Sequence, residues 1–152
     1  MSGHLFSNDG GHGYTASIRS GGVSSKMSEI SADVSTNSIV FTPLLTHSVT
    51  LQRAGVIIAT GGATLFSSGF GTVSSLIITI GGVQACQEWS GFHSNSIDRV
   101  HALIGRASVA AGTHIVNLEW KTSNVVLAVQ VRAATNNFEN ASVSSIIIEG
   151  DA

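Results

Sequence analysis

The chain has 152 residues, enough for one domain with its own core, and its net charge of −2 offers no electrostatic footprint for nucleic acid. No apolar run approaches the length needed to span a membrane. Charged residues make up only 11% of the chain, against about 25% in typical domains, so we expect a homo-oligomer or larger assembly to cover part of the surface, with a neutral, Ser/Thr-rich monomer as the alternative.

Residues 1–37 differ from the rest of the chain because they are rich in Gly and Ser and poor in large apolar side chains. Such a segment buries little surface by itself. We interpret it as an N-terminal arm that attaches the domain to a partner, with one or two short strands at most; a disordered end is the alternative. His4, Asp9 and His12 lie close together in this segment, but they match no standard ligand spacing, so we expect no metal there.

From residue 38 onward, short runs of Val, Ile and Thr alternate with turn residues at about ten-residue spacing. No window of adequate length shows a helical period. We expect about nine strands, at residues 38–42, 47–52, 55–66, 73–80, 83–89, 97–109, 113–121, 125–132 and 143–148. The pattern predicts an all-β fold, an antiparallel β-sandwich or jelly roll that spans residues 38–152.

Several turn residues carry specific predictions. Pro43 follows the first strand and suits a strand end or a turn. Gly61-Gly62 is expected to form a bend or bulge, whereas Gly81-Gly82 predicts a two-residue hairpin. Gly112 precedes a strand at a position where a tight turn can require positive φ. Cys86 is the single cysteine, so no intrachain disulfide can form, and its apolar neighbours predict a buried thiol.

The segment from residue 113 to residue 132 reads as two strands and a turn. In the first strand one face holds Val116, Leu118 and Trp120, which predicts core packing, and the other holds Ile115, Asn117, Glu119 and Lys121. Thr122-Ser123-Asn124 suits a turn. A second apolar face follows, made of Val125, Leu127, Val129 and Val131. We therefore predict an antiparallel hairpin of these two strands.

This segment carries a family resemblance. The string AGTHIVNLEW follows IDRVHALIGRASV and precedes SSIIIEG. Together they resemble the C-terminal half of small jelly-roll domains in bacteriophage virion proteins, and the match covers roughly residues 73–149. Those domains look like the tumour-necrosis-factor and complement globular-head type of jelly roll, which usually assembles as trimers.

The resemblance implies a structural virion protein, assembled in the host cytoplasm, that forms a homotrimer. A capsid decoration (cement) protein or a small head or tail component would suit this length, with the major capsid protein among its partners. The motifs give no indication of a cofactor.

Trp89, Phe92 and His93 are the candidates for ligand or partner contact, because aromatic side chains at a loop can stack on a sugar or enter a partner's pocket. The alternative is that Trp89 ends a core strand and Phe92 tucks beneath the loop. If these residues do bind a ligand, the chain is a host-recognition or carbohydrate-binding module. This reading is the alternative to the structural role.

Catalysis has little support in the sequence. Glu88, His93 and Asp98 surround one polar loop, but proximity in sequence does not supply the hydrogen-bonded nucleophile and base that a hydrolase needs. We therefore expect that this chain is not an enzyme. Arg99 and Arg106 recur on the expected outer face of one strand, where they would pair with Glu119 of a neighbouring strand or with another subunit.

Overall fold

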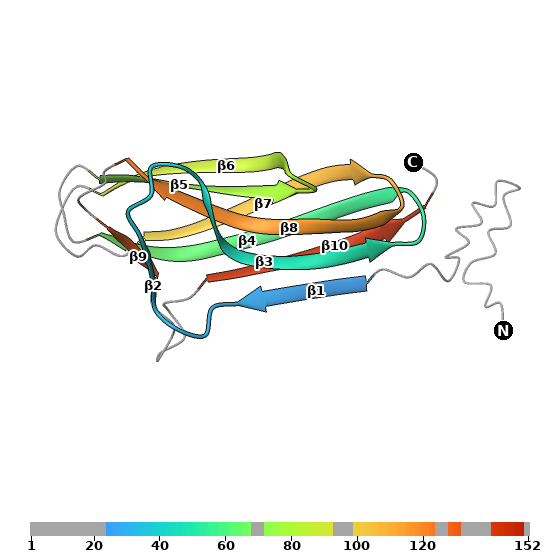
Figure 1. Ribbon diagram of the computed structural model, residues 1–152, viewed down its shortest axis with the longest axis horizontal. Helices are drawn as coiled ribbons and strands as arrows, with labels where there is room; N and C mark the ends of the chain where they lie inside the picture. The colour runs from blue at the N-terminus through green and yellow to red at the C-terminus, as the bar shows by residue number, and fades with distance from the viewer. Residues whose placement is uncertain (1–23, 68–71, 93–98, 124–127, 132–140, 151–152) are drawn as a thin grey trace, which may run out of the picture.

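The computed structural model describes residues 24–67, 72–92, 99–123, 128–131 and 141–150 (Figure 1). These residues form ten strands and no helix. The strands are β1 (Ser24–Glu29), β2 (Val34–Thr36), β3 (Thr42–Leu51), β4 (Gly55–Ser67), β5 (Thr72–Ile80), β6 (Val83–Phe92), β7 (Arg99–Val109), β8 (Gly112–Thr122), β9 (Val129–Val131) and β10 (Ala141–Glu149). The predicted all-β class is confirmed.

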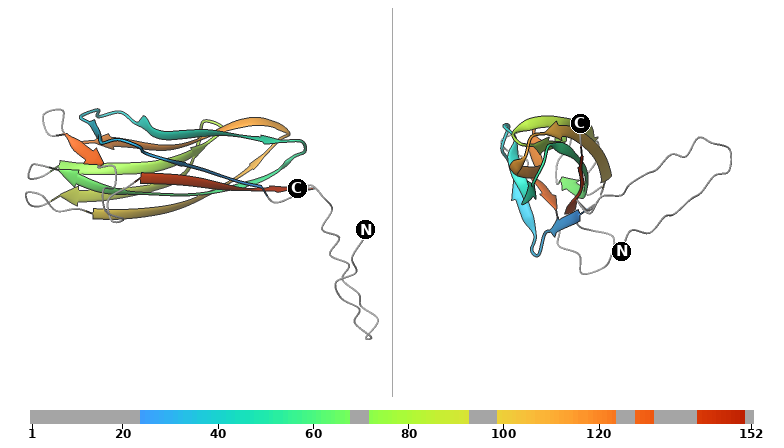
Figure 2. Two further views of the ribbon diagram at one scale, coloured as in Figure 1. Left: turned by 90° about the horizontal axis from the view of Figure 1, so that it is seen from below. Right: turned by 90° about the vertical axis from the view of Figure 1, so that its right-hand side faces the viewer.

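The strands form two antiparallel sheets that pack face to face (Figures 1 and 2). One sheet has the order β3-β8-β5-β6. In the other sheet, β1 pairs with β10 and β10 pairs with β4. Most of β4 also pairs with β7, whereas the end of β4 pairs with β9, and β9 pairs with β2. Successive parts of the chain cross between the sheets, which is the jelly-roll arrangement that the sequence predicted.

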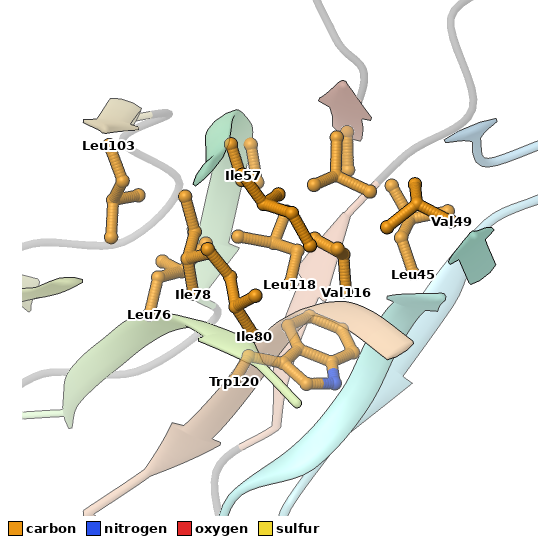
Figure 3. Packing of buried hydrophobic residues seen from close by; sticks show 14 of the residues in the cluster. Leu45, Val49, Ile57, Leu76, Ile78, Ile80, Leu103, Val116, Leu118 and Trp120 are labelled. Atoms are coloured by element: carbon orange, nitrogen blue, oxygen red, sulfur yellow. The ribbon is translucent and has the colours of Figure 1, made fainter. Parts of the chain in front are cut away.

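The core lies between the two sheets and is built by period-2 alternation. In β8, Val116, Leu118 and Trp120 point inward, as predicted, and Trp120 is only 2% exposed. They meet residues from both sheets (Figure 3): Leu45, Val49, Ile57, Leu76, Ile78, Ile80 and Leu103. Most of these side chains are branched at Cβ or Cγ, and they suit the flat interior between packed sheets.

Two glycine predictions are confirmed by the backbone. Gly81 and Gly82 have φ of 60° and 81°, and they form the tight hairpin that joins β5 to β6. Gly112 has φ of 132° at the start of β8. L-residues with a side chain rarely adopt these conformations, so glycine is the residue that each turn favours.

The predicted bend or bulge at Gly61-Gly62 is wrong. Strand β4 runs through both residues with unbroken register to β10 and β7. The glycines serve close packing instead. A Cβ on Gly62 would lie 2.7 Å from the carbonyl oxygen of His101, and one on Gly61 would lie 3.2 Å from Cδ1 of Leu118.

The strand predicted at residues 38–42 is also wrong. Residues 37–41 contain no strand; the hydroxyl of Ser38 donates to the carbonyl oxygen of Val40 at 2.7 Å and closes a local turn. Pro43 does not end a strand but lies inside β3, where the register shifts between Pro43 and Leu45. Proline has no N–H to donate, and an edge strand with an irregular register tolerates that loss.

The predicted hairpin of residues 113–132 is not formed, because its two strands belong to different sheets. Strand β8 pairs with β3 and β5, whereas β9 is only three residues long and pairs with β2 and β4. The alternation itself was read correctly, since Val129 and Val131 are buried. A period of two assigns a side chain to a face, but it does not assign a strand to a sheet.

Within the predicted arm, residues 24–37 are described and contain β1 and β2. Strand β1 pairs with β10 along its whole length, and β2 pairs with β9. The candidate metal ligands His4, Asp9 and His12 lie outside the described residues.

Candidate interaction face

The sequence-predicted contact residues are placed only in part. Trp89 and Phe92 belong to β6, at the edge of its sheet. Their side chains, and all of His93, lie outside what the structure describes, as do Asp98 and the side chains of Glu88 and Arg99. Cys86 is half-buried rather than fully buried, since β6 is an edge strand, and it packs against the core.

Among the described residues, no three His, Cys, Asp or Glu side chains gather closely enough to hold a metal ion. The same part of the chain contains no helix that could cross a membrane.

The predicted contact between Arg106 and Glu119 is not formed. Arg106 lies on β7 and Glu119 on β8, on the outer faces of opposite sheets. The carboxylate of Glu119 accepts hydrogen bonds from the Thr79 hydroxyl at 2.8 Å and from Nδ2 of Asn117 at 3.2 Å. The prediction assumed that β7 and β8, being consecutive, would be neighbours, but the chain crosses to the other sheet between them.

The outer face of the β3-β8-β5-β6 sheet is polar. Across β3 and β8, the hydroxyl of Thr46 donates to the side-chain carbonyl of Asn117 at 2.9 Å, and the hydroxyls of Thr50 and Thr113 share a hydrogen bond of the same length. Glu119 joins this network through Asn117. This face shows the polar surface expected of an antiparallel sheet that contacts water.

The outer face of the opposite sheet carries several exposed apolar side chains, with hydroxyl-bearing residues between them. We call it the β10–β4 face; its outward residues come from four adjacent strands. The most exposed are Val100 at 78%, Ile104 at 67% and Met27 at 62%. The face comprises Ser25, Met27 and Glu29 of β1; Ser142, Ser144, Ile146 and Ile148 of β10; Val56, Ile58, Thr60 and Gly62 of β4; and Val100, Ala102, Ile104, Arg106 and Ser108 of β7.

Strand register sets Ile146 opposite Ile58 and Ile148 opposite Val56, so apolar side chains of β10 and β4 stand together in two successive rows. In the row on the other side of Ile146, Met27 and Ile104 lie at the two ends, and the hydroxyl residues Ser144 and Thr60 lie between them. Charge is confined to the two flanking strands, where Glu29 of β1 and Arg106 of β7 are the charged residues of the described face. Contiguous exposed apolar surface of this kind marks an interaction site.

A shallow depression of about 460 Å³ lies in the middle of the face. Gly62, one of the outward residues of β4, carries no side chain at this place. The residues that line it are Thr60, Gly61, Gly62, Ala102, Leu103, Ile104, Ser142 and Ser144. The hydroxyls of Thr60 and Ser144, which line this depression, hydrogen-bond each other at 2.7 Å.

Sequence reasoning missed this face, although two strands carried a signal for it. The runs GVIIA in β4 and SSIIIEG in β10 break the apolar–polar alternation. A strand that is apolar on both sides is expected to be covered on both sides. The signal was present in each strand, but only the pairing of β4 with β10 brings the two runs together.

A buried polar pair lies at one side of the same sheet, beneath β1. Nε2 of His47 lies 2.7 Å from the hydroxyl of Ser145, and both residues are buried. Burial lowers the pKa of His47 below its ordinary value of 6.5, and the nearby charge of Lys26 lowers it further. His47 is therefore neutral in the folded protein at neutral pH.

This burial predicts that acid destabilises the fold through His47. The unfolded chain takes up the proton near pH 6.5, whereas the folded chain takes it up only at lower pH. The stabilising contribution is thus fully present above about pH 6.5 and is lost as pH falls through the folded pKa. We expect the free energy of unfolding in urea to fall less between about pH 7.5 and about pH 5 in His47→Gln than in the wild type. Equal losses in the two proteins would show that His47 is not the responsible group.

Comparisons with known proteins concern the fold. No protein-family model and no curated protein matches the sequence. A structure of infectious bursal disease virus, Gt strain, covers 84% of this chain and 38% of its own, at 11% identity with a TM-score of 0.48. The VP2 subviral particle of the same virus covers 82% and 40%, at 12% identity and a TM-score of 0.46.

A carbohydrate-binding module, CBM36 in complex with calcium and xylotriose, covers 79% of this chain and 87% of its own, at 16% identity with a TM-score of 0.38. This chain spans about two-fifths of the length of the virus chains that it matches. The likeness at these identities concerns the fold alone.

Proposed function

We propose that this chain is a structural, non-enzymatic protein of a bacteriophage virion that acts as a homotrimer. Its role would be that of a capsid decoration (cement) protein or of a small head or tail component. The resemblance of the strings AGTHIVNLEW and SSIIIEG to phage jelly-roll domains supports the virion assignment. The low charge of the chain supports an assembled state.

The observation that carries the proposal is the β10–β4 face. Four strands about 4.8 Å apart and about eight residues long cover roughly 500 Å² in projection. A standard interface buries about 800 Å² on each partner, so this face is of the right order to form most of one. Water contact with side chains such as Ile104 and Val100 is unfavourable, at about 25 cal/mol for each Å² of apolar surface. Association with another subunit removes the contact of these side chains with water.

A second copy of the same chain is the partner that this face suits. The face carries one acidic and one basic residue, Glu29 and Arg106, and is otherwise apolar or hydroxyl-bearing. Three copies can therefore turn this face toward a common threefold axis without charge repulsion. In the virion, the trimer would cement neighbouring subunits of the major capsid protein or of another virion protein, with the part of the N-terminal segment that precedes β1 as the attachment segment. Such contacts stabilise the assembly by mass action.

The proposed oligomer is tested by the mass of the purified protein in solution. Light scattering behind a sizing column is expected to give three times the chain mass of 15.6 kDa, and the same value on dilution. A chain-sized mass at every concentration would contradict the homotrimer. The virion assignment is tested separately, by mass spectrometry of purified particles of the phage that encodes the chain. Absence of its peptides among those of the capsid proteins would refute it.

A further inference from the structure

Strand β1 closes the gap between the edges of the two sheets. On one side it pairs with β10 over six registered positions, from Ser24 opposite Ile147 to Glu29 opposite Ser142. On the other side it lies beside β3, the edge strand of the second sheet (Figure 1). Nζ of Lys26 donates to the carbonyl oxygen of Ser48 at 2.9 Å, and the Ser28 hydroxyl donates to the carbonyl oxygen of Thr46 at 3.5 Å.

This strand is held almost entirely by main-chain and polar contacts. Ser25, Lys26, Met27 and Glu29 are exposed, and Ser28 is half-buried. The first residue of the segment that packs against the core is Ile30, whose N–H donates to the carbonyl oxygen of Ala141 at 3.2 Å. Because β1 buries little apolar surface, its detachment costs much less free energy than that of a core strand.

The place that β1 occupies between β10 and β3, here called the groove, would need another strand if β1 detached. Its floor includes Val143 and the hydrogen-bonded pair of Ser145 and His47, all of them buried. Removal of β1 would expose this floor together with the main-chain donors and acceptors along the edge of β10. An open edge of that kind readily accepts another extended strand.

We propose that this groove is a strand-acceptor site for β1 of a second copy of the chain, so that neighbouring protomers of the oligomer exchange β1. An identical strand from a neighbouring copy can form the same hydrogen bonds with β10 and the same two contacts with β3. The exposed residues Ser31, Ala32 and Asp33 form the hinge, while β2 stays paired with β9.

The position of β1 supports exchange because it is continuous with the proposed interface. Met27 lies in the β10–β4 face, in the same row as Ser144 and Thr60. A copy that covers this face therefore lies next to the groove. The inference rests on the homo-oligomer proposed above and specifies how its copies are linked.

The experiment traps β1 in the groove through a disulfide between two different chains. Ser28 and Val143 stand directly opposite each other in the ladder, at the short Cα separation that a disulfide spans. Val143 is fully buried, so only a strand that occupies the groove can reach it. Chains with Ser28→Cys and differently sized, tagged chains with Val143→Cys, both carrying Cys86→Ser, are refolded together and oxidised with oxidised glutathione.

If β1 is exchanged, a non-reducing gel should show a covalent heterodimer. A reducing agent should separate this heterodimer into its two chains. The matched control pairs Ser28→Cys with Val116→Cys, which is equally buried but lies on β8 in the other sheet; this pair should give no heterodimer. The double variant Ser28→Cys/Val143→Cys reports whether the pair can form a disulfide within one chain. A second pair, Lys26→Cys with Ser145→Cys, also stands opposite in the ladder and repeats the test if Val143→Cys does not fold.

Light scattering on the same samples separates the two proposals. An oligomer whose mixed single variants give no heterodimer, while the double variant forms its disulfide within one chain, overturns strand exchange and leaves the oligomer standing. A monomer that forms the disulfide only within one chain overturns both. An oligomer with the heterodimer supports both.

Discussion

Replacement of Ile146 by Asp is expected to convert the homo-oligomer into a monomer. Ile146 lies in the middle of the β10–β4 face, on β10, and is 43% exposed in the single chain. In the assembly an Asp at this position would be a desolvated charge without a partner, which costs several kcal/mol at each interface. Light scattering behind a sizing column should show the mass fall to that of one chain.

Ile115→Asp is the matched control for this substitution. Ile115 is 44% exposed and points outward from β8, which, like β10, is the second strand of its sheet. The two substitutions therefore place the same charge in similar surroundings on opposite faces of the sandwich. We expect Ile115→Asp to remain oligomeric. If Ile146→Asp also keeps the wild-type mass, the proposed interface is wrong. If only Ile115→Asp dissociates, the interface lies on the other sheet.

Leu118→Ala is expected to lower the free energy of unfolding by about 3 kcal/mol. Leu118 is fully buried between the two sheets, where its Cδ1 packs against Gly61 of the opposite sheet. Loss of its isobutyl group removes apolar burial and leaves a cavity, and such substitutions cost about 2–5 kcal/mol. Urea denaturation followed by tryptophan fluorescence measures the loss.

The comparison must be made at one protein concentration, because association of the copies adds to the apparent stability. Ile115→Ala is the control, since Ile115 is half-exposed on β8 and lies outside the proposed interface. We expect it to cost less than about 1 kcal/mol. A loss in Leu118→Ala no larger than in this control would be inconsistent with a core between the two sheets at Leu118.

The local features of the fold were predictable from the sequence. Alternation in the segment THIVNLEWK identified the inward face of β8, including Trp120, and Gly81-Gly82 identified a hairpin. These features depend on residues that are close in the chain, through the period of a strand and the φ values open to glycine. The same reasoning identified the all-β class, because it requires only the number of strands and the absence of a helical period.

The candidate interaction face, in contrast, was decided by tertiary structure. Met27, Ile104 and Ile146 are far apart in the sequence, and each alone is an ordinary apolar residue. They form one surface because β1, β10, β4 and β7 are neighbours in one sheet, and the register sets which rows they share.

The errors in the sequence prediction have the same origin. Arg106 and Glu119 were expected to be neighbours, and β8 and β9 to form a hairpin, because each pair is close in the chain. Alternation determines the face on which a side chain lies, but the sheet that a strand joins depends on which distant edge offers it hydrogen-bonding partners and apolar cover. That choice is made by the packing of the whole chain. The strands could therefore be predicted from the sequence alone, whereas the surface that they form together could not.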